Sequence, residues 1–99
     1  MSTKKSHDST ANRIAKKFGT DYNKGKGADI ITPKLVVEVE TPTTVKGGLS
    51  QLQGYKKLVY IAGANKEATQ RAIEKAKNTT IGVMDSQGKI IKSSSRGKK

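Results

Sequence analysis

The chain has 99 residues, of which 20 are Lys or Arg and eight are Asp or Glu, so its formal net charge is +12. This length suits one small domain, and the excess of positive charge favours nucleic acid as the partner over a role of the lysines in solubility alone. The absence of cysteine excludes disulfides and thiolate metal sites, and one histidine cannot build an imidazole cage. No apolar run approaches the roughly 20 residues that cross a bilayer, so we expect no membrane partner and a cytoplasmic location.

Polar and basic residues fill both ends of the chain. We predict flexible basic tails at residues 1–7 and 93–99, around a single domain at residues 8–92. Residues 10–18 are predicted to form the first helix, since their apolar positions recur at helical spacing and a glycine follows as a stop; these positions are Ala11, Ile14, Ala15 and Phe18.

A hairpin is expected after the glycine-rich residues 25–27. Residues 28–32 and 34–40 have the composition of strands, and Pro33 between them predicts a tight turn. Residues 42–55 are predicted to form a second helix, because apolar residues recur at helical spacing after a proline that suits a first turn.

The second half of the chain alternates between strand and helix patterns. Residues 57–62 and 79–84 are predicted to be buried strands, and residues 66–77 a helix capped by Asn65. A turn at residues 85–88 then leads to a last short segment. This order predicts an α/β fold with a central mixed sheet flanked by helices.

Three of the eight acidic residues lie in the expected hairpin: Asp29, Glu38 and Glu40. Because side chains alternate along a strand, Glu38 and Glu40 share one face, and Asp29 on the neighbouring strand can converge with them. Converging carboxylates repel one another unless they are protonated or bind a cation, and Mg²⁺ fits such oxygen ligands. Alternatively, both glutamates lie on a solvated strand face and Asp29 is a turn residue.

This hairpin resembles the core motif of the PD-(D/E)xK nuclease superfamily, in which an Asp and a Glu-x-Lys lie on adjacent strands. The matching residues are Gly27-Ala28-Asp29-Ile30 and Val36-Val37-Glu38-Val39-Glu40. Gln51-Leu52-Gln53-Gly54-Tyr55 is similar to the Gln-x-x-x-Tyr pattern of RecB-like and archaeal Holliday-junction-resolvase-like members. The resemblance covers residues 8–84 and implies a small three-layer restriction-endonuclease-like fold.

The resemblance also implies site residues. Asp29 and Glu38 would hold Mg²⁺ or Mn²⁺ together with the backbone carbonyl of Val39. Glu40 stands where the motif has a lysine; some restriction endonucleases of the superfamily carry Glu there and remain nucleases, so Glu40 would orient or deprotonate the attacking water. Otherwise, the lost lysine marks a fold that binds nucleic acid without cutting it. Gln51 would be a further catalytic residue, or else an exposed helix residue.

Contacts to nucleic acid are expected from Lys24, Lys26, Lys46 and Tyr55, with Tyr55 alternatively a partly buried core aromatic. His7 and Asp8 precede the first predicted helix, where some family members place an acidic or His residue at the site. We interpret both as tail residues.

The sequence thus predicts a Mg²⁺-dependent DNA endonuclease that hydrolyses phosphodiester bonds, either with the structure selectivity of a junction resolvase or without specificity. A chain this small is expected to act as a homodimer to engage both strands. One alternative is a noncatalytic DNA-binding protein on the same fold. Another is a basic RNA-binding protein of unrelated α/β fold, favoured if Asp29, Glu38 and Glu40 fail to converge.

Overall fold

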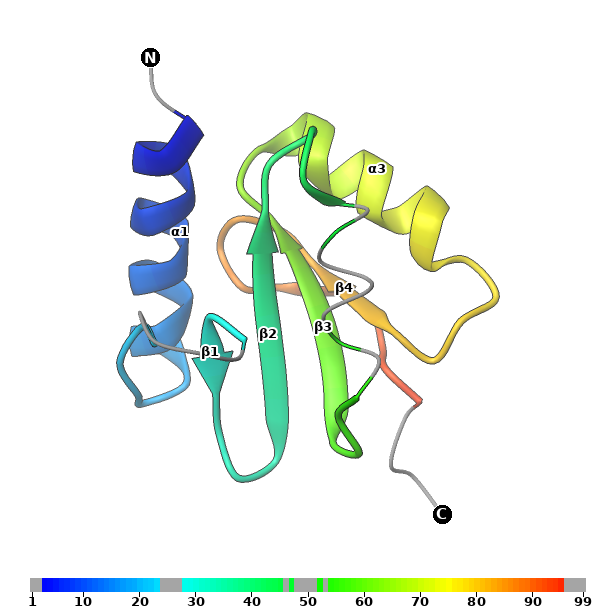
Figure 1. The fold of residues 1–99 in the computed structure, drawn as a ribbon, viewed down its shortest axis with the longest axis horizontal. Coiled ribbons are helices and arrows are strands. Elements are labelled where there is room, and N and C mark those ends of the chain that lie inside the picture. Colours follow the sequence, from blue (N-terminus) through cyan, green and yellow to red (C-terminus); the bar gives the residue numbers. More distant parts are fainter. Residues whose placement is uncertain (1–2, 24–27, 46, 48–51, 53, 96–99) are drawn as a thin grey trace.

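The computed structural model describes residues 3–23, 28–45, 47, 52 and 54–95, and Figure 1 shows their arrangement. The centre is a five-stranded mixed sheet whose strands lie side by side in chain order. The strands are β1 (Ile30–Ile31), β2 (Leu35–Glu40), β3 (Leu58–Gly63), β4 (Gly82–Met84) and β5 (Ile90–Lys92). β2, β3 and β4 are parallel, whereas the edge strands β1 and β5 run antiparallel to their neighbours.

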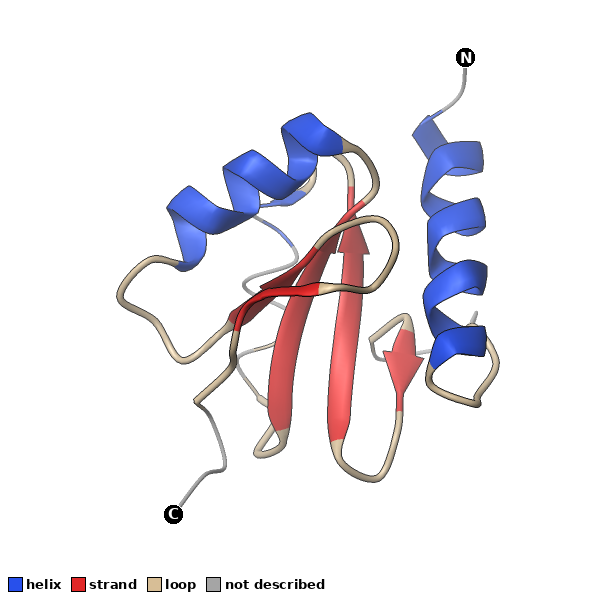
Figure 2. Ribbon diagram, turned by 180° about the vertical axis from the view of Figure 1, so that it is seen from behind, coloured by secondary structure: helices blue, strands red, loops and turns tan. Residues whose placement is uncertain are grey.

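Two helices, α1 (Thr3–Lys17) and α3 (Lys66–Ala76), cover opposite faces of the sheet (Figure 2). Each helix buries its own apolar cluster against the strands. The cluster under α1 contains Ala11, Ile14, Ala15, Ile30, Val37, Val39, Tyr60, Ala62, Ala64 and Met84. The cluster under α3 contains Ala28, Val36, Val45, Leu52, Val59, Ile61, Ala72, Ala76, Ile81 and Val83. The predicted α/β fold, with a mixed sheet between helical layers, is confirmed.

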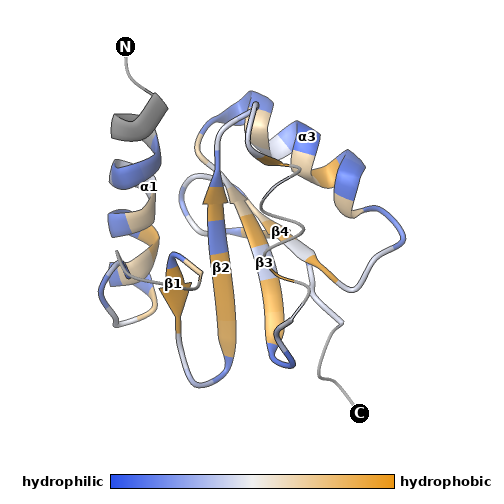
Figure 3. Cartoon of the chain, viewed as in Figure 1, coloured by the Kyte–Doolittle hydropathy of each residue, from blue (hydrophilic) through white to orange (hydrophobic). Residues whose placement is uncertain are grey.

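The β1–β2 hairpin forms as predicted. Its turn is closed by Thr32, whose backbone amide and hydroxyl both donate to the Leu35 carbonyl, at 2.8 and 3.0 Å. β2 alternates as expected, since Val37 and Val39 lie under α1 and Val36 lies on the α3 side. Figure 3 shows hydrophilic colour interrupting the otherwise hydrophobic β2.

The second half of the chain also follows the sequence pattern. Asn65 caps α3, and its side-chain oxygen accepts a hydrogen bond from the Ala68 amide at 2.8 Å. None of the described helices is long and apolar enough to cross a membrane. Within the predicted helix at residues 42–55, Val45 and Gly47 are helical, whereas positions 46, 48–51 and 53 lie outside the described residues.

The predicted N-terminal tail is wrong over residues 3–7, because α1 begins at Thr3. The apolar periodicity that predicts a helix starts only at Ala11, since the earlier residues are polar; among them, His7 contacts Asp8 and Asp29. Further along α1, Arg13 donates to the Ser86 carbonyl at 2.6 Å and Lys17 to the Gly88 carbonyl at 2.9 Å. The helix is therefore tied to the turn between β4 and β5.

The predicted C-terminal tail is also wrong at its start, because Ser94 is 1% exposed. Its hydroxyl donates to the Thr80 carbonyl at 2.8 Å and accepts from the Val59 amide at 3.0 Å. β4 begins only at Gly82, opposite Tyr60, so Ser94 supplies the partner that the ladder does not give to Val59.

We expect Ser94→Ala to lower the free energy of unfolding by about 1–3 kcal/mol, because it leaves the buried Val59 amide without an acceptor. Ser93→Ala removes an exposed hydroxyl one residue earlier and should change stability by less than about 0.5 kcal/mol. Urea denaturation of both variants beside the wild type measures the difference. Equal midpoints for the two variants would show that Ser94 carries no structural hydrogen bond.

Candidate functional site

Asp29 lies one residue before β1, where its side chain replaces part of the ladder. The register that pairs Ile30 with Val37 brings Asp29 opposite Glu38. Asp29 Oδ2 accepts a hydrogen bond from the Val39 backbone amide at 2.9 Å. The Asp29 carboxylate is thereby fixed against β2, the strand that carries the two glutamates.

Glu38 is buried next to Asp29 and forms a hydrogen bond with its carboxylate. Burial raises the pKa of Glu38 to about 9, and the hydrogen bond and negative charge of Asp29 act in the same direction. Glu38 is therefore a neutral acid at pH 7 and donates its proton to Asp29. Its Oε2 atom is buried and has no hydrogen-bond partner among the described residues.

Asp29 remains ionised despite its position. Burial alone would raise its pKa, but hydrogen bonds from His7, Glu38 and the Val39 amide lower it below the usual range. The two carboxyls thus have opposite charge states at neutral pH. Together they carry one negative charge instead of two, which relieves the repulsion expected from the sequence.

His7 reaches this pair from α1 and corrects the interpretation of residues 7 and 8 as tail. Its Nε2 lies 3.0 Å from Asp29 Oδ2, and its Nδ1 lies 3.2 Å from Asp8 Oδ1. Tyr22 donates to the same Asp8 oxygen at 3.0 Å and lies edge-on to the imidazole. The hydrogen bond with Asp29 raises the pKa of His7 to about 9, against the opposing effect of burial. His7 is therefore a cation at pH 7.

Glu40 is 7% exposed, so the alternative of a solvated glutamate face is wrong. Burial raises the pKa of Glu40 to about 7, although a hydrogen bond from Thr44 and the charge of His7 lower it. Asp29, Glu38 and Glu40 lie close enough for their charges to interact, but within the described ranges no three His, Cys, Asp or Glu side chains are grouped to hold an ion. Asp29 and Glu38 form a pair, and Glu40 is bonded to Thr44.

Tyr55 holds the backbone that leads into Asp29. Its hydroxyl accepts a hydrogen bond from the Ala28 amide at 2.9 Å, so its described contact is structural, while the predicted contact with nucleic acid stays untested. Asn23 holds the same segment. Its side-chain Nδ2 donates to the Ala28 carbonyl at 3.0 Å, and its backbone amide donates to the Asp29 carbonyl at 2.7 Å. The other predicted site residues lie outside the described part of the chain: Lys24, Lys26, Lys46 and Gln51.

The donor set at this pair suits a small hard cation. Glu38 Oε2 is a buried oxygen without a hydrogen-bond partner in the described structure, and the ionised Asp29 lies beside it. The carbonyl of Val39 points to the same side of β2 as its amide, which faces Asp29. Ala28, which a continued ladder would place opposite Val39, donates its amide to Tyr55 instead. Asp29 and Glu38 are thus paired, and the Val39 carbonyl lies along the edge of β2 that faces Asp29.

No protein-family model, curated protein or solved structure matches the chain. Membership in the PD-(D/E)xK nuclease superfamily stays a prediction from the motif residues.

The buried acid at Glu38 predicts a stability that falls with rising pH. Its pKa is about 9 in the folded chain and 4.5 as a free side chain, so the folded state binds more protons between these values. The contribution is complete below pH 4.5 and is lost as the pH rises through about 9. Glu38→Gln keeps a neutral donor to Asp29, and at pH 8 in EDTA its free energy of unfolding should exceed that of the wild type by on the order of 5 kcal/mol.

Urea denaturation from pH 5 to 9 measures this difference. The exposed acid Glu67, changed to Gln, is the matched control and should follow the wild-type curve. A constant gap between Glu38→Gln and the wild type across this range would contradict a protonated Glu38.

Proposed function

We propose that the protein is a metal-dependent DNA endonuclease. The observation that supports this most directly is the Asp29–Glu38 pair, in which Asp29 directly precedes β1 and Glu38 lies on the adjacent antiparallel strand β2, in the order of the motif. Burying an acid lowers the stability of a small domain. A function of this acid in binding a cation would explain why it is buried. The net charge of +12 supports a polyanionic substrate.

Asp29, Glu38 and the Val39 carbonyl would hold Mg²⁺ or Mn²⁺ in this proposal. When bound, such an ion lowers the pKa of a water and offsets the charge of a scissile phosphate. Glu38 must lose its proton before it can bind the ion as a carboxylate, because at neutral pH that proton is shared with Asp29 in a hydrogen bond. Binding of the ion is therefore coupled to the loss of a proton.

His7 acts as a positioning residue for Asp29. It donates from Nε2 to Asp29 Oδ2, while Asp8 on its other ring nitrogen fixes the imidazole orientation. Its positive charge also keeps Asp29 ionised. Because the motif lysine is missing, His7 is the cationic side chain that the described structure places against the carboxyl pair.

Glu40 is suited to general-base catalysis. A base works best when its pKa lies near the working pH, and burial brings the pKa of Glu40 to about 7. Thr44 bonds to its carboxyl and restricts its orientation. A lysine at this position could not accept a proton from water at neutral pH, so Glu40 replaces a cation with a base.

A second candidate is a noncatalytic DNA-binding protein on the same fold. The observation that favours it is the same Glu40, because a carboxylate cannot stabilise negative charge developing on the phosphate. DNA binding that is unaffected by chelation, without nicking, would support this candidate.

The proposed ion should stabilise the folded chain. At Mn²⁺ concentrations of about 100 Kd, ligand linkage adds about 2.7 kcal/mol, which raises Tm by on the order of 10 °C. Asp29→Asn and Glu38→Gln should lose this increase, whereas Asp21→Asn, the same change at an exposed acid, should keep it. Calorimetric titration in buffers of different ionisation enthalpy should show close to one proton released per ion at pH 7.

Scanning calorimetry with Mn²⁺ or EDTA provides the Tm values. If Mn²⁺ raised the Tm of Asp29→Asn and of Asp21→Asn by the same amount, the ion would bind at another site.

Cleavage should depend on the same two residues. We expect the wild type to nick or cut DNA in Mn²⁺, and Asp29→Asn or Glu38→Gln to lower the rate by at least about 100-fold. Glu40→Gln should lower kcat with little change in KM, since it removes a proton acceptor. Plasmid, single-stranded, flapped and four-way-junction DNA serve as substrates, with Asp21→Asn as the active control. Full activity of both pair variants would refute the site.

A further inference from the structure

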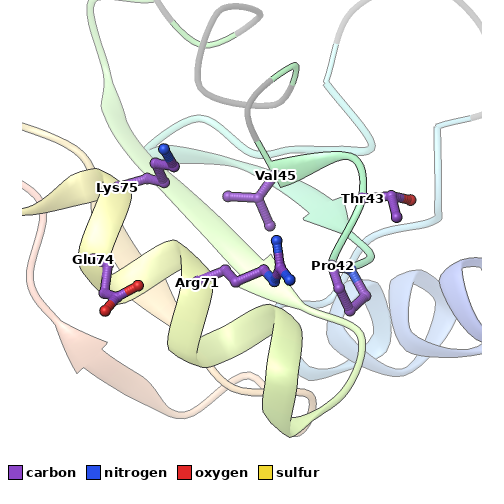
Figure 4. A pocket seen from close by; sticks show the side chains of 6 residues that line it. All are labelled: Pro42, Thr43, Val45, Arg71, Glu74 and Lys75. Carbon is purple, nitrogen blue, oxygen red and sulfur yellow. The ribbon is translucent and has the colours of Figure 1, made fainter.

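A hollow of about 650 Å³ lies between α3 and the segment that follows β2. Its lining residues are Pro42, Thr43, Val45, Arg71, Glu74 and Lys75. Figure 4 shows the side chains of Arg71 and Lys75 rising from α3 toward the segment that carries Val45. The two cations are one helical turn apart, so they border the same opening.

This hollow is on the same side of the sheet as the glutamates. α3 packs on the face that contains Val36, and Glu38 and Glu40 share that face because they lie two and four positions further along β2. Pro42 follows Glu38 of the carboxyl pair by four residues, which is at most about 14 Å of chain. The hollow and the carboxyl pair are therefore close enough for a single DNA strand to contact both.

The side chains of the hollow have the chemistry of a phosphate site. Arg71 and Lys75 supply two positive charges against one negative charge from Glu74. Arg71 also contacts Glu67 at 3.3 Å, but both side chains are more than half exposed, so this ion pair is weak and can yield to a phosphate. Pro42 and Val45 add apolar surface, which suits the sugar of a nucleotide.

We infer that this hollow binds backbone phosphates of the DNA strand that reaches the carboxyl pair, with Arg71 and Lys75 as the phosphate ligands. The inference rests on the proposed DNA-binding function and extends it, because neither Arg71 nor Lys75 is among the residues expected from the sequence to contact DNA. The segment from Thr41 to Val45 connects the two sites. Thr44 bonds both to Glu40 and to Thr41, so a strand in the hollow borders the residues that orient Glu40.

The test is the salt dependence of DNA binding, measured in EDTA so that no cleavage is needed. A fluorescent DNA duplex is titrated with the full chain at several salt concentrations, and anisotropy gives Kd. Arg71→Gln and Lys75→Gln should each weaken binding and reduce the slope of log K against log salt by about 0.9. Glu74→Gln should bind more tightly than the wild type, because it removes the negative charge from the hollow.

Lys77→Gln is the matched control, since it removes an exposed positive charge just beyond α3 and outside the hollow. Its slope should stay near the wild-type value. Equal slopes for Lys75→Gln and Lys77→Gln overturn the inference, even if the wild type cleaves DNA. Reduced slopes for Arg71→Gln and Lys75→Gln support it, even if no cleavage is seen. Slope changes with duplex RNA but not with DNA overturn the assignment to DNA.

Discussion

The hydrogen bond between the Asp29 and Glu38 carboxyls is the interaction on which the rest of the site depends. Two acids in one small domain can be buried together only if one of them keeps its proton or an ion joins them. The chain meets this constraint by surrounding Asp29 with donors, so that it alone stays ionised. His7 comes from α1, the Val39 amide from β2, and Tyr55 holds the preceding residue in place.

Opposite charge requirements meet at this site. In the proposed enzyme, a net charge of +12 would attract DNA, whereas exposed carboxylates would repel the phosphate to be cut. Burial of Glu38 in its neutral form removes one of these negative charges, and in the proposal a cation would take the place of the proton. In the proposed enzyme, cation and DNA therefore assist each other's binding. Glu40 fits the same scheme, because an acid with a pKa of about 7 is only partly charged at neutral pH.

Local patterns in the sequence predicted much of this fold. The hairpin, the alternation along β2, and the Asn65 cap of α3 each depend on residues a few positions apart, and all three are confirmed. The errors occur where a residue depends on distant partners. His7 contacts Asp29, 22 positions along the chain, and Ser94 contacts Val59, 35 positions away.

The site shows the same limit. The pairing of Asp29 with Glu38 followed from strand geometry and the motif. The placement of Glu40 beside Thr44 did not, because a spacing of two along a strand fixes a shared face but not a shared contact. Polar residues in the first turns of α1 gave no helical signal, since only tertiary contacts reveal what holds them.

α1 is held at two points along its length. His7 is fixed to the hairpin, and six residues later, about 9 Å along the axis, Arg13 is fixed to the turn between β4 and β5. Because one helix carries both contacts, a change in the tilt of the helix at one contact would also shift the residues at the other. The Ser86 and Gly88 carbonyls thus help to hold the helix that carries the imidazole to Asp29, although they lie 73 and 71 residues from Arg13 and Lys17. Changes in that remote turn would act on the site mechanically, through the tilt of a helix.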